Sequence, residues 1–269
     1  MKRHIQRLRI SEIVYDNQSL RLFYRMLSNE EMIYEKEIFL IQKLIKPGDL
    51  VADIGANRGE YSYFFSKLVG DDGCVYSFEP GSRARHILQK IIEKSKLDNV
   101  RLIPMALSDS EGETELIVPY FNRQSQINSN KPIKGRRERV PLNTLDNFAR
   151  SENLKRLDFI KCDTEGAEML VFKGSVRVIS EFQPVVMVEI AEPHLTRFGF
   201  KVEEVRDFFI SRNYMMYTFD FPMQKLIEAK EIVLKAEGHV WSGKHENLEN
   251  NNYIFIPQTK LNLVKDFLA

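Results

Sequence analysis

Apolar and polar positions form blocks along the chain that predict strands alternating with helices. The apolar run DLVADIG ends in glycine and precedes an amphipathic stretch over residues 59–69, which together predict a strand and a helix. The run CVYSFEP and the stretch over residues 82–95 repeat this pattern. Strands that alternate with helices predict an α/β fold, with a mostly parallel sheet covered by helices on both faces.

The same patterns continue to the end of the chain. We expect NVRLIPMAL to form one strand that ends near Ser108-Asp109, and ETELIVPY to form an extra strand. A polar, basic loop is expected over residues 121–139. The remaining predicted elements are a short helix at Leu145-Asp146, the strand LDFIKCD, a helix at 166–173, the strand PVVMVEI, a helix at 202–212, the strand YMMYTF, a charged stretch at 224–250 and the strand NYIFIP.

A length of 269 residues suits one large α/β domain with appendages. Residues 30–46 begin with acids and end with lysine before Pro47-Gly48, which is the polarity and the stop signal of a helix. We therefore divide the chain into an N-terminal helical extension over residues 1–46, one domain over residues 47–257 and a tail over residues 258–269.

Composition and charge exclude several classes of protein. The net charge of +1 gives no overall attraction to nucleic acid or to an anionic membrane. Cys74 and Cys162 lie in predicted buried strands, which argues against a disulfide or a metal site. The basic N-terminus precedes no signal-like apolar stretch, and no run of about 18 apolar residues occurs, so we expect a cytoplasmic protein without a transmembrane segment.

A ligand site is expected where predicted strands end, because open parallel sheets bind ligands at the carboxyl ends of their strands. Gly55 and Gly59 allow a tight turn from strand to helix and a close approach of the backbone to a ligand. Glu79 follows the second strand, where a carboxylate can accept both hydroxyls of a ribose. An adenosine-containing ligand is therefore predicted.

The charge of the loop indicates which adenosine ligand it suits. Asn57 stands where the dinucleotide motif has its second glycine, and the acid Asp53 lies two residues ahead of the loop. S-adenosylmethionine carries a sulfonium and an ammonium but no phosphate, so it suits an acidic loop better than a dinucleotide does. A P-loop is excluded because no GK[ST] follows the glycines. The residues expected to bind S-adenosylmethionine are Asp53, Gly55, Ala56, Asn57, Gly59, Glu79, Pro80, Ser108, Asp109 and Asp163.

These segments resemble the FkbM-type methyltransferases, which are similar to the broader class I Rossmann-like methyltransferases. The resemblance covers about residues 47–190 well, and NYIFIP resembles the family's closing strand. It implies a seven-stranded sheet with one antiparallel strand and O-methylation of a hydroxyl, commonly on a sugar or a polyketide-like metabolite. The matching segments are PGDLVADIGANRGEYS, VYSFEP, ALSDSEG, LDFIKCDTEGAEMLVFKG and PVVMVEI, in that order.

Methyl transfer from a sulfonium is an in-line displacement, so catalysis consists chiefly of placing the acceptor oxygen opposite the S–CH3 bond. A base that takes the hydroxyl proton adds roughly 100- to 10,000-fold. We expect Asp163 to be this base, followed by Glu189, with Glu165 and His194 as rivals. Paired acids can also hold a divalent cation, but no third ligand is evident, and we expect no metal.

The loop at residues 121–139 carries six basic residues against one acid, Glu138. It could be a lid for an anionic acceptor, or a solvated loop, which is the usual role of such a charge run. Nucleic acid is not expected, because no aromatic residues are interleaved with the basic ones. The basic residues are Arg123, Lys131, Lys134, Arg136, Arg137 and Arg139.

The function that we expect is S-adenosylmethionine-dependent O-methylation of a hydroxyl on a small molecule or saccharide. Two alternatives remain open at this point. One is an NAD(P)-dependent oxidoreductase, which the loop sequence disfavours, and the other is a non-catalytic binding protein with a methyltransferase-like fold. Self-association is also left open.

Overall fold

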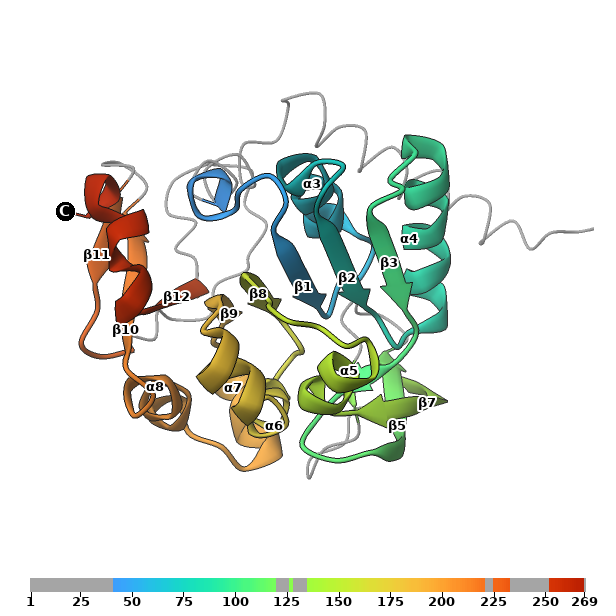
Figure 1. Cartoon of the computed structure of the whole chain (residues 1–269). Coiled ribbons are helices and arrows are strands. Elements are labelled where there is room, and N and C mark those ends of the chain that lie inside the picture. The colour runs from blue at the N-terminus through green and yellow to red at the C-terminus, as the bar shows by residue number, and fades with distance from the viewer. Residues whose placement is uncertain (1–40, 120–125, 128–134, 221–224, 233–251, 269) are drawn as a thin grey trace, which may run out of the picture.

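The computed structural model describes residues 41–119, 126–127, 135–220, 225–232 and 252–268 (Figure 1). In these residues the chain forms a central eight-stranded sheet of order β11-β10-β12-β9-β8-β1-β2-β3 and a second sheet of order β4-β7-β5-β6. The central strands are β1 Leu50–Ile54, β2 Cys74–Phe78, β3 Val100–Ile103, β8 Phe159–Cys162, β9 Val185–Glu189, β10 Tyr214–Asp220, β11 Lys225–Glu228 and β12 Asn252–Pro257. The second sheet comprises β4 Ala106–Leu107, β5 Gly112–Pro119, β6 Gln126–Ile127 and β7 Gly135–Asn143. The expected α/β fold is confirmed.

The central sheet is mixed. Strands β3, β2, β1, β8 and β9 are parallel, whereas β12 is antiparallel to both β9 and β10. Strand β11 is antiparallel to β10. It is an eighth strand in the described residues, whereas the resemblance implies a sheet of seven strands. Strand β11 escaped prediction because it is only four residues long and lies in a charged stretch, although its Leu226 is completely buried.

The order of the strands reverses between β1 and β8. From β1 the chain runs outward through β2 and β3, and it later returns to the other side of β1 as β8. Figure 1 shows the two strands side by side near the middle of the sheet. The carboxyl ends of β1 and β8 therefore form the switch point, at which open α/β sheets bind ligands.

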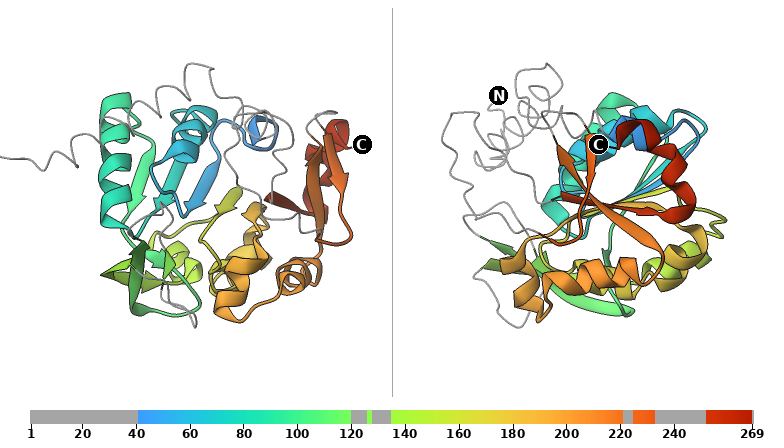
Figure 2. Two further views of the ribbon diagram at one scale, coloured as in Figure 1. Left: turned by 180° about the vertical axis from the view of Figure 1, so that it is seen from behind. Right: turned by 90° about the vertical axis from the view of Figure 1, so that its left-hand side faces the viewer.

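Helices cover both faces of the sheet (Figure 2). Residues 41–44 are helical and pack on the face of the sheet that α3 Glu60–Val69 and α4 Ser82–Ser95 cover. Val264, near the C-terminus, is fully buried on the same face. Residues 30–40 of the helix predicted at 30–46 lie outside the described residues, and the helix ends at Leu44 rather than at residue 46. Within the described ranges, no helix has the length and apolar character needed to cross a bilayer. The first face carries α3 Glu60–Val69, α4 Ser82–Ser95, η3 Gln258–Leu263 and η4 Lys265–Phe267; the other carries α5 Leu145–Ser151, α6 Glu168–Lys173, η1 Val178–Phe182, α7 Glu192–Leu195, η2 Thr196–Phe198 and α8 Val202–Ile210.

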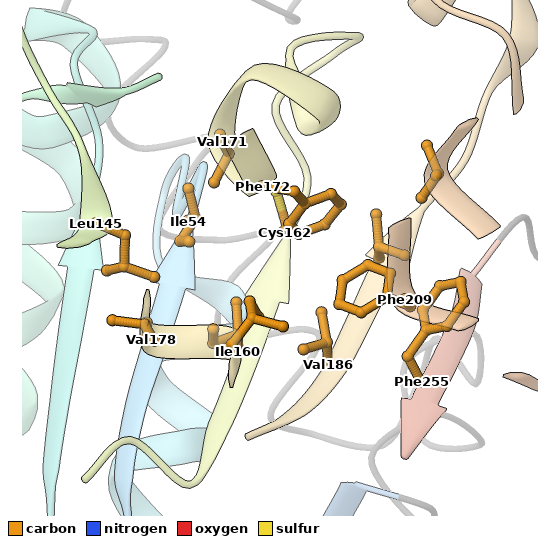
Figure 3. Close-up of a cluster of buried hydrophobic side chains, with 14 of the residues drawn as sticks. Ile54, Leu145, Ile160, Cys162, Val171, Phe172, Val178, Val186, Phe209 and Phe255 are labelled. Atoms are coloured by element: carbon orange, nitrogen blue, oxygen red, sulfur yellow. The ribbon is translucent and has the colours of Figure 1, made fainter. Parts of the chain in front are cut away.

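Successive side chains along the strands point to opposite faces of the sheet, and each face has its own apolar core. Ile160 and Cys162 point into the core beneath α6 and α8, whereas Phe159 points into the core beneath α3. In Figure 3 the first core is completed by Phe209 and Phe255, whose ring centroids lie 4.2 Å apart. Cys162 is buried and both cysteines are free.

Two expected elements differ from the structure. The segment NVRLIPMAL is not one strand, because Pro104, which has no backbone N–H, separates β3 from β4, and these strands join different sheets. The predicted loop is wrong for residues 135–139, which begin strand β7 and pair with residues 115–119 of β5. Their polarity suggested a loop, but both strands expose charged side chains here. Residues 120–125 and 128–134 lie outside the described residues.

Candidate active site

A cavity opens at the switch point between β1 and β8. Its polar wall is formed by the residues that follow β1, β2 and β8, and its apolar wall includes Leu116 and Ile127 of the second sheet. It encloses about 720 Å³ of space, counting the part that is open to solvent. The polar wall comprises Gly55, Asn57, Glu79, Asp163, Thr164 and Glu165.

The glycine corner after β1 packs closely against the rest of the site. Gly55 has φ 80°, and a Cβ there would lie 1.8 Å from the carbonyl oxygen of Asp163. Gly59 has φ 92°, and a Cβ there would lie 2.2 Å from a methyl carbon of Leu88. Both residues must therefore be glycine, and the corner between β1 and α3 lies directly against the segment after β8.

Glu79 connects the end of β2 to this corner. Its Oε2 accepts a hydrogen bond from the Asn57 backbone N–H at 2.8 Å, and its Oε1 accepts one from Gly81 at 2.7 Å. Burial raises the pKa of Glu79 to about 7, against the lowering effect of these two hydrogen bonds. Each carboxylate oxygen can accept a second hydrogen bond, so Glu79 retains acceptor capacity toward the cavity that it lines.

Asp53 lies below the cavity rather than in its wall. Its side chain is fully buried, and its Oδ2 accepts a hydrogen bond from the Ser62 hydroxyl at 2.6 Å. Its Oδ1 is buried and has no hydrogen-bond partner within the described part of the chain. Burial raises the pKa of Asp53, although the Lys161 ammonium and the Ser62 hydrogen bond oppose this. Asp53 therefore supports the corner from the interior of the protein.

Asp163 and Glu189 form a coupled pair of acids at the ends of β8 and β9. Asp163 accepts a hydrogen bond from Lys161 at 3.0 Å and shares another with the Glu189 carboxyl. Burial alone would raise the pKa of Asp163, but Lys161 and Glu189 outweigh it and lower the pKa. The pKa of Glu189 lies well above its ordinary value because of the Asp163 charge and then burial. Within the pair, Glu189 therefore binds a proton more readily than Asp163 does.

His194 and Glu165 form a second pair of ionisable side chains near Asp163 and Glu189. The Nδ1 atom of His194 is 3.0 Å from the Glu165 Oε2, and the hydrogen bond to Glu165 raises the pKa of His194 above its ordinary value. Glu165 lines the cavity and has φ 58°, a left-handed conformation that is unusual for glutamate. Buried Glu168 holds this turn by accepting hydrogen bonds from the backbone N–H groups of Thr164 and Gly166.

The structure brings most of the expected site residues to one place. Gly55, Asn57, Glu79, Pro80, Asp163 and Glu165 line the cavity, while Asp53, Ala56, Gly59, Glu189 and His194 belong to the segments next to it without lining it. Ser108 and Asp109 directly follow β4 and do not line the cavity; Ser108 is buried and Asp109 is exposed. Leu107 lines the cavity instead. The binding and catalytic roles of all these residues remain predictions.

Sequence reasoning overlooked Lys161. This side chain is buried in β8 and donates to Asp163. A lone lysine inside the apolar run LDFIKCD was the signal that could have revealed it, because a buried cation requires acidic partners. Within the described ranges, no group of three or more His, Cys, Asp or Glu side chains could hold a metal ion.

The basic residues that β7 contributes are paired with acids. Arg137 forms an ion pair with Glu115 of β5, and Arg139 lies 3.6 Å from Glu113. Arg136 pairs with Glu138 on its own strand. These pairs remove much of the positive charge on which the hypothesis of an anion-binding lid was based. The other three basic residues, Arg123, Lys131 and Lys134, lie outside the described residues.

Because these pairs are exposed, we expect Arg137→Gln and Arg139→Gln each to change the free energy of unfolding by less than about 1 kcal/mol. Urea denaturation of the two variants measures this change, and Glu115→Gln with the double variant Arg137→Gln/Glu115→Gln completes a cycle that isolates the pair. A coupling free energy above about 2 kcal/mol would show that the pair is a structural element of the second sheet.

The sheet with its reversal between β1 and β8, the glycine corner and the acid after β2 define a Rossmann-like methyltransferase fold. The chain belongs to the FkbM methyltransferase family, since the model of the Methyltransferase FkbM domain matches residues 53–216. The family resemblance expected from the sequence is thus confirmed.

Several solved structures are similar to this chain. The crystal structure of methyltransferase FkbM from Methylobacillus flagellatus KT has a TM-score of 0.46 and 15% sequence identity over 66% of this chain, and the match spans only 45% of that protein. A putative rRNA methylase from Clostridium thermocellum has a TM-score of 0.48 and 13% identity over 83% of this chain and 94% of its own. A search among curated proteins found no match.

Proposed function

We propose that this protein is an S-adenosylmethionine-dependent methyltransferase that methylates a hydroxyl group of a small molecule or saccharide. The observation that carries the proposal is the convergence of the Glu79 and Asp163 carboxyls on one cavity beside the glycine corner at Gly55. Membership of the FkbM family supports methyl transfer as the reaction. Beyond family membership, we propose the cofactor, the class of acceptor and the base.

The chemistry of the cavity favours a cationic nucleoside over a dinucleotide. Glu79, Asp163 and Glu165 line it, so a pyrophosphate would meet carboxylates, whereas a sulfonium and an ammonium would be attracted. Glu79 can accept hydrogen bonds from ribose hydroxyls. The apolar wall, which includes Met105 and Leu116, suits the faces of a nucleobase. The residues of this site therefore fit S-adenosylmethionine.

When bound, S-adenosylmethionine supplies a methyl group by in-line displacement, and its thioether leaves without needing a proton. The protein has to orient the acceptor hydroxyl and accept its proton. Asp163 suits this task because it lines the cavity and because Lys161 and the hydrogen bond with Glu189 favour its ionised form. His194 suits it less well, because its contact with Glu165 favours the charged imidazolium, which has no lone pair to accept a proton.

Calorimetric titration tests the cofactor. We expect S-adenosylmethionine and its demethylated product to bind and NAD not to bind. Glu79→Gln should weaken the binding of S-adenosylmethionine about 10- to 100-fold, because the amide presents an N–H group where a carboxylate oxygen now accepts from the backbone. Glu93→Gln, the same change at an exposed position of α4, is the matched control and should bind as the unmodified protein does.

Transfer of a labelled methyl group to small molecules and saccharides in a cell extract then tests the reaction. Binding of S-adenosylmethionine without transfer would indicate a non-catalytic binding protein. Binding of NAD in its place would contradict the proposal and favour an oxidoreductase.

A further inference from the structure

Lys161 is a charged residue buried in the middle of the sheet. It lies on β8, in register with Asp53 on β1 and Met187 on β9, and its side chain is 5% exposed. Its ammonium donates to Asp163 at 3.0 Å and lies 4.5 Å from the ring centroid of Tyr61 on α3. A lysine at this depth requires compensating charge.

Acidic groups surround the Lys161 ammonium from several elements. Asp163 follows β8, Asp53 lies on β1, Glu189 ends β9, and Glu60 begins α3. Burial alone would lower the pKa of Lys161, but Asp163 and Asp53 raise it above the ordinary value, so the ammonium stays charged. The cation is therefore attracted by both Asp53 and Asp163, and it forms a hydrogen bond with Asp163.

The other neighbours of Asp163 are ionisable groups as well. Glu189 donates a hydrogen bond to it, and His194 of α7 contributes a further favourable charge. Glu168 and Asp53 are acids that oppose its ionisation. Among these groups, Lys161 makes the direct ionic contact.

We propose that Lys161 is a positioning residue of the reaction, whose buried ammonium holds the Asp163 carboxylate as an ion in the cavity wall and leaves the shared proton on Glu189. This inference deepens the proposed function, because it rests on Asp163 being the base. Without the ammonium, the proton of the pair would be shared with Asp163, and the base would be partly neutralised before the acceptor bound. Lys161 itself need not touch the acceptor or the cofactor.

The test is a titration of the Asp163 and Glu189 carboxyl carbons by ¹³C NMR, with signals assigned through Asp163→Asn and Glu189→Gln. We expect Asp163 of the unmodified protein to stay ionised from pH 5 to pH 8. In Lys161→Met its titration should move up by about one to three pH units. Lys161→Arg should restore the original titration to within about half a unit, because it keeps the charge. Lys94→Met, the same change at an exposed position of α4, should leave it unmoved.

Kinetics provide the second measurement. In Lys161→Met, kcat for methyl transfer should fall as the pH is lowered from 8 toward 5, where the shifted titration neutralises Asp163, and it should recover as the pH rises to 8. If Lys161→Met does not fold, Lys161→Gln replaces it. The titration of the unmodified protein can overturn the inference without any variant.

Titration of Asp163 at or above its ordinary range in the unmodified protein would overturn the inference, and so would an unmoved titration in the neutral variants. The NMR measurement uses neither cofactor nor acceptor. A protein that binds no S-adenosylmethionine and transfers no methyl group would therefore refute the proposed function without deciding this result.

Discussion

Replacing Asp163 by asparagine is expected to lower kcat for methyl transfer at saturating S-adenosylmethionine by about 100- to 10,000-fold. The amide retains nearly the same shape but cannot accept the acceptor's proton, and it no longer offers an ionised oxygen to Lys161. Single-turnover measurement of labelled methyl transfer separates this loss of chemistry from a loss of binding.

The matched control is Asp72→Asn, the same change in an exposed turn, which should retain the original kcat. Asp163→Asn also removes the ionic partner of the Lys161 ammonium, so the thermal unfolding of this variant should be measured in parallel. A folded Asp163→Asn protein with an unchanged rate would show that another group accepts the proton, and Glu165 with His194 would be the next pair to test.

Gly55→Ala is expected to abolish cofactor binding and to destabilise the protein by about 3 kcal/mol or more, since two costs combine at this position. The residue has φ 80°, and its Cβ would lie 1.8 Å from the Asp163 carbonyl oxygen, which is a backbone atom and cannot turn away. Urea denaturation measures the stability, and calorimetry with S-adenosylmethionine measures the binding.

Gly48→Ala separates the two costs. Gly48 has φ 87°, but a Cβ there would have no atom within 4 Å, so only the backbone term of about 1–2 kcal/mol applies. The Gly48 variant should bind the cofactor normally. Equal destabilisation of the two variants would mean that the backbone at Gly55 shifts to accommodate the Cβ, and that the close contact between β1 and the segment after β8 contributes little to stability.

The sequence predicted the central sheet well because its strands are strong, regular signals. The apolar runs in DLVADIG, CVYSFEP and LDFIKCD are each followed by a glycine or an acid, and each run forms a parallel strand whose end faces the site. The helix predicted at 82–95 has those same bounds in the structure. Local pattern and tertiary packing agree in these elements.

The second sheet was not predicted because its evidence is not local. Pro104 divides an apolar run whose two halves look alike, and only the pairing partners of β3 and β4 separate them. In β7 the pattern RRER resembles a solvated loop until its pairing with β5 is known. Ser108 and Asp109 accordingly follow β4 of the second sheet rather than a strand of the central sheet.

The partnership of Lys161, Asp163 and Glu189 could not be predicted for a related reason. The three residues lie on two strands, and their protonation depends on distances and burial that no spacing along the chain reveals. A sequence can show that an apolar strand contains a lysine, but the acids that compensate it become visible only when the strands are placed side by side.

The two walls of the cavity have separate origins in the chain. The acids come from strand ends of the central sheet, whereas Leu116 and Ile127 come from a sheet inserted between β3 and α5. Substitutions in the inserted sheet can reshape one wall while the carboxyl groups keep their places. Descendants of this protein could therefore diverge in the molecules they accept while inheriting the same reaction.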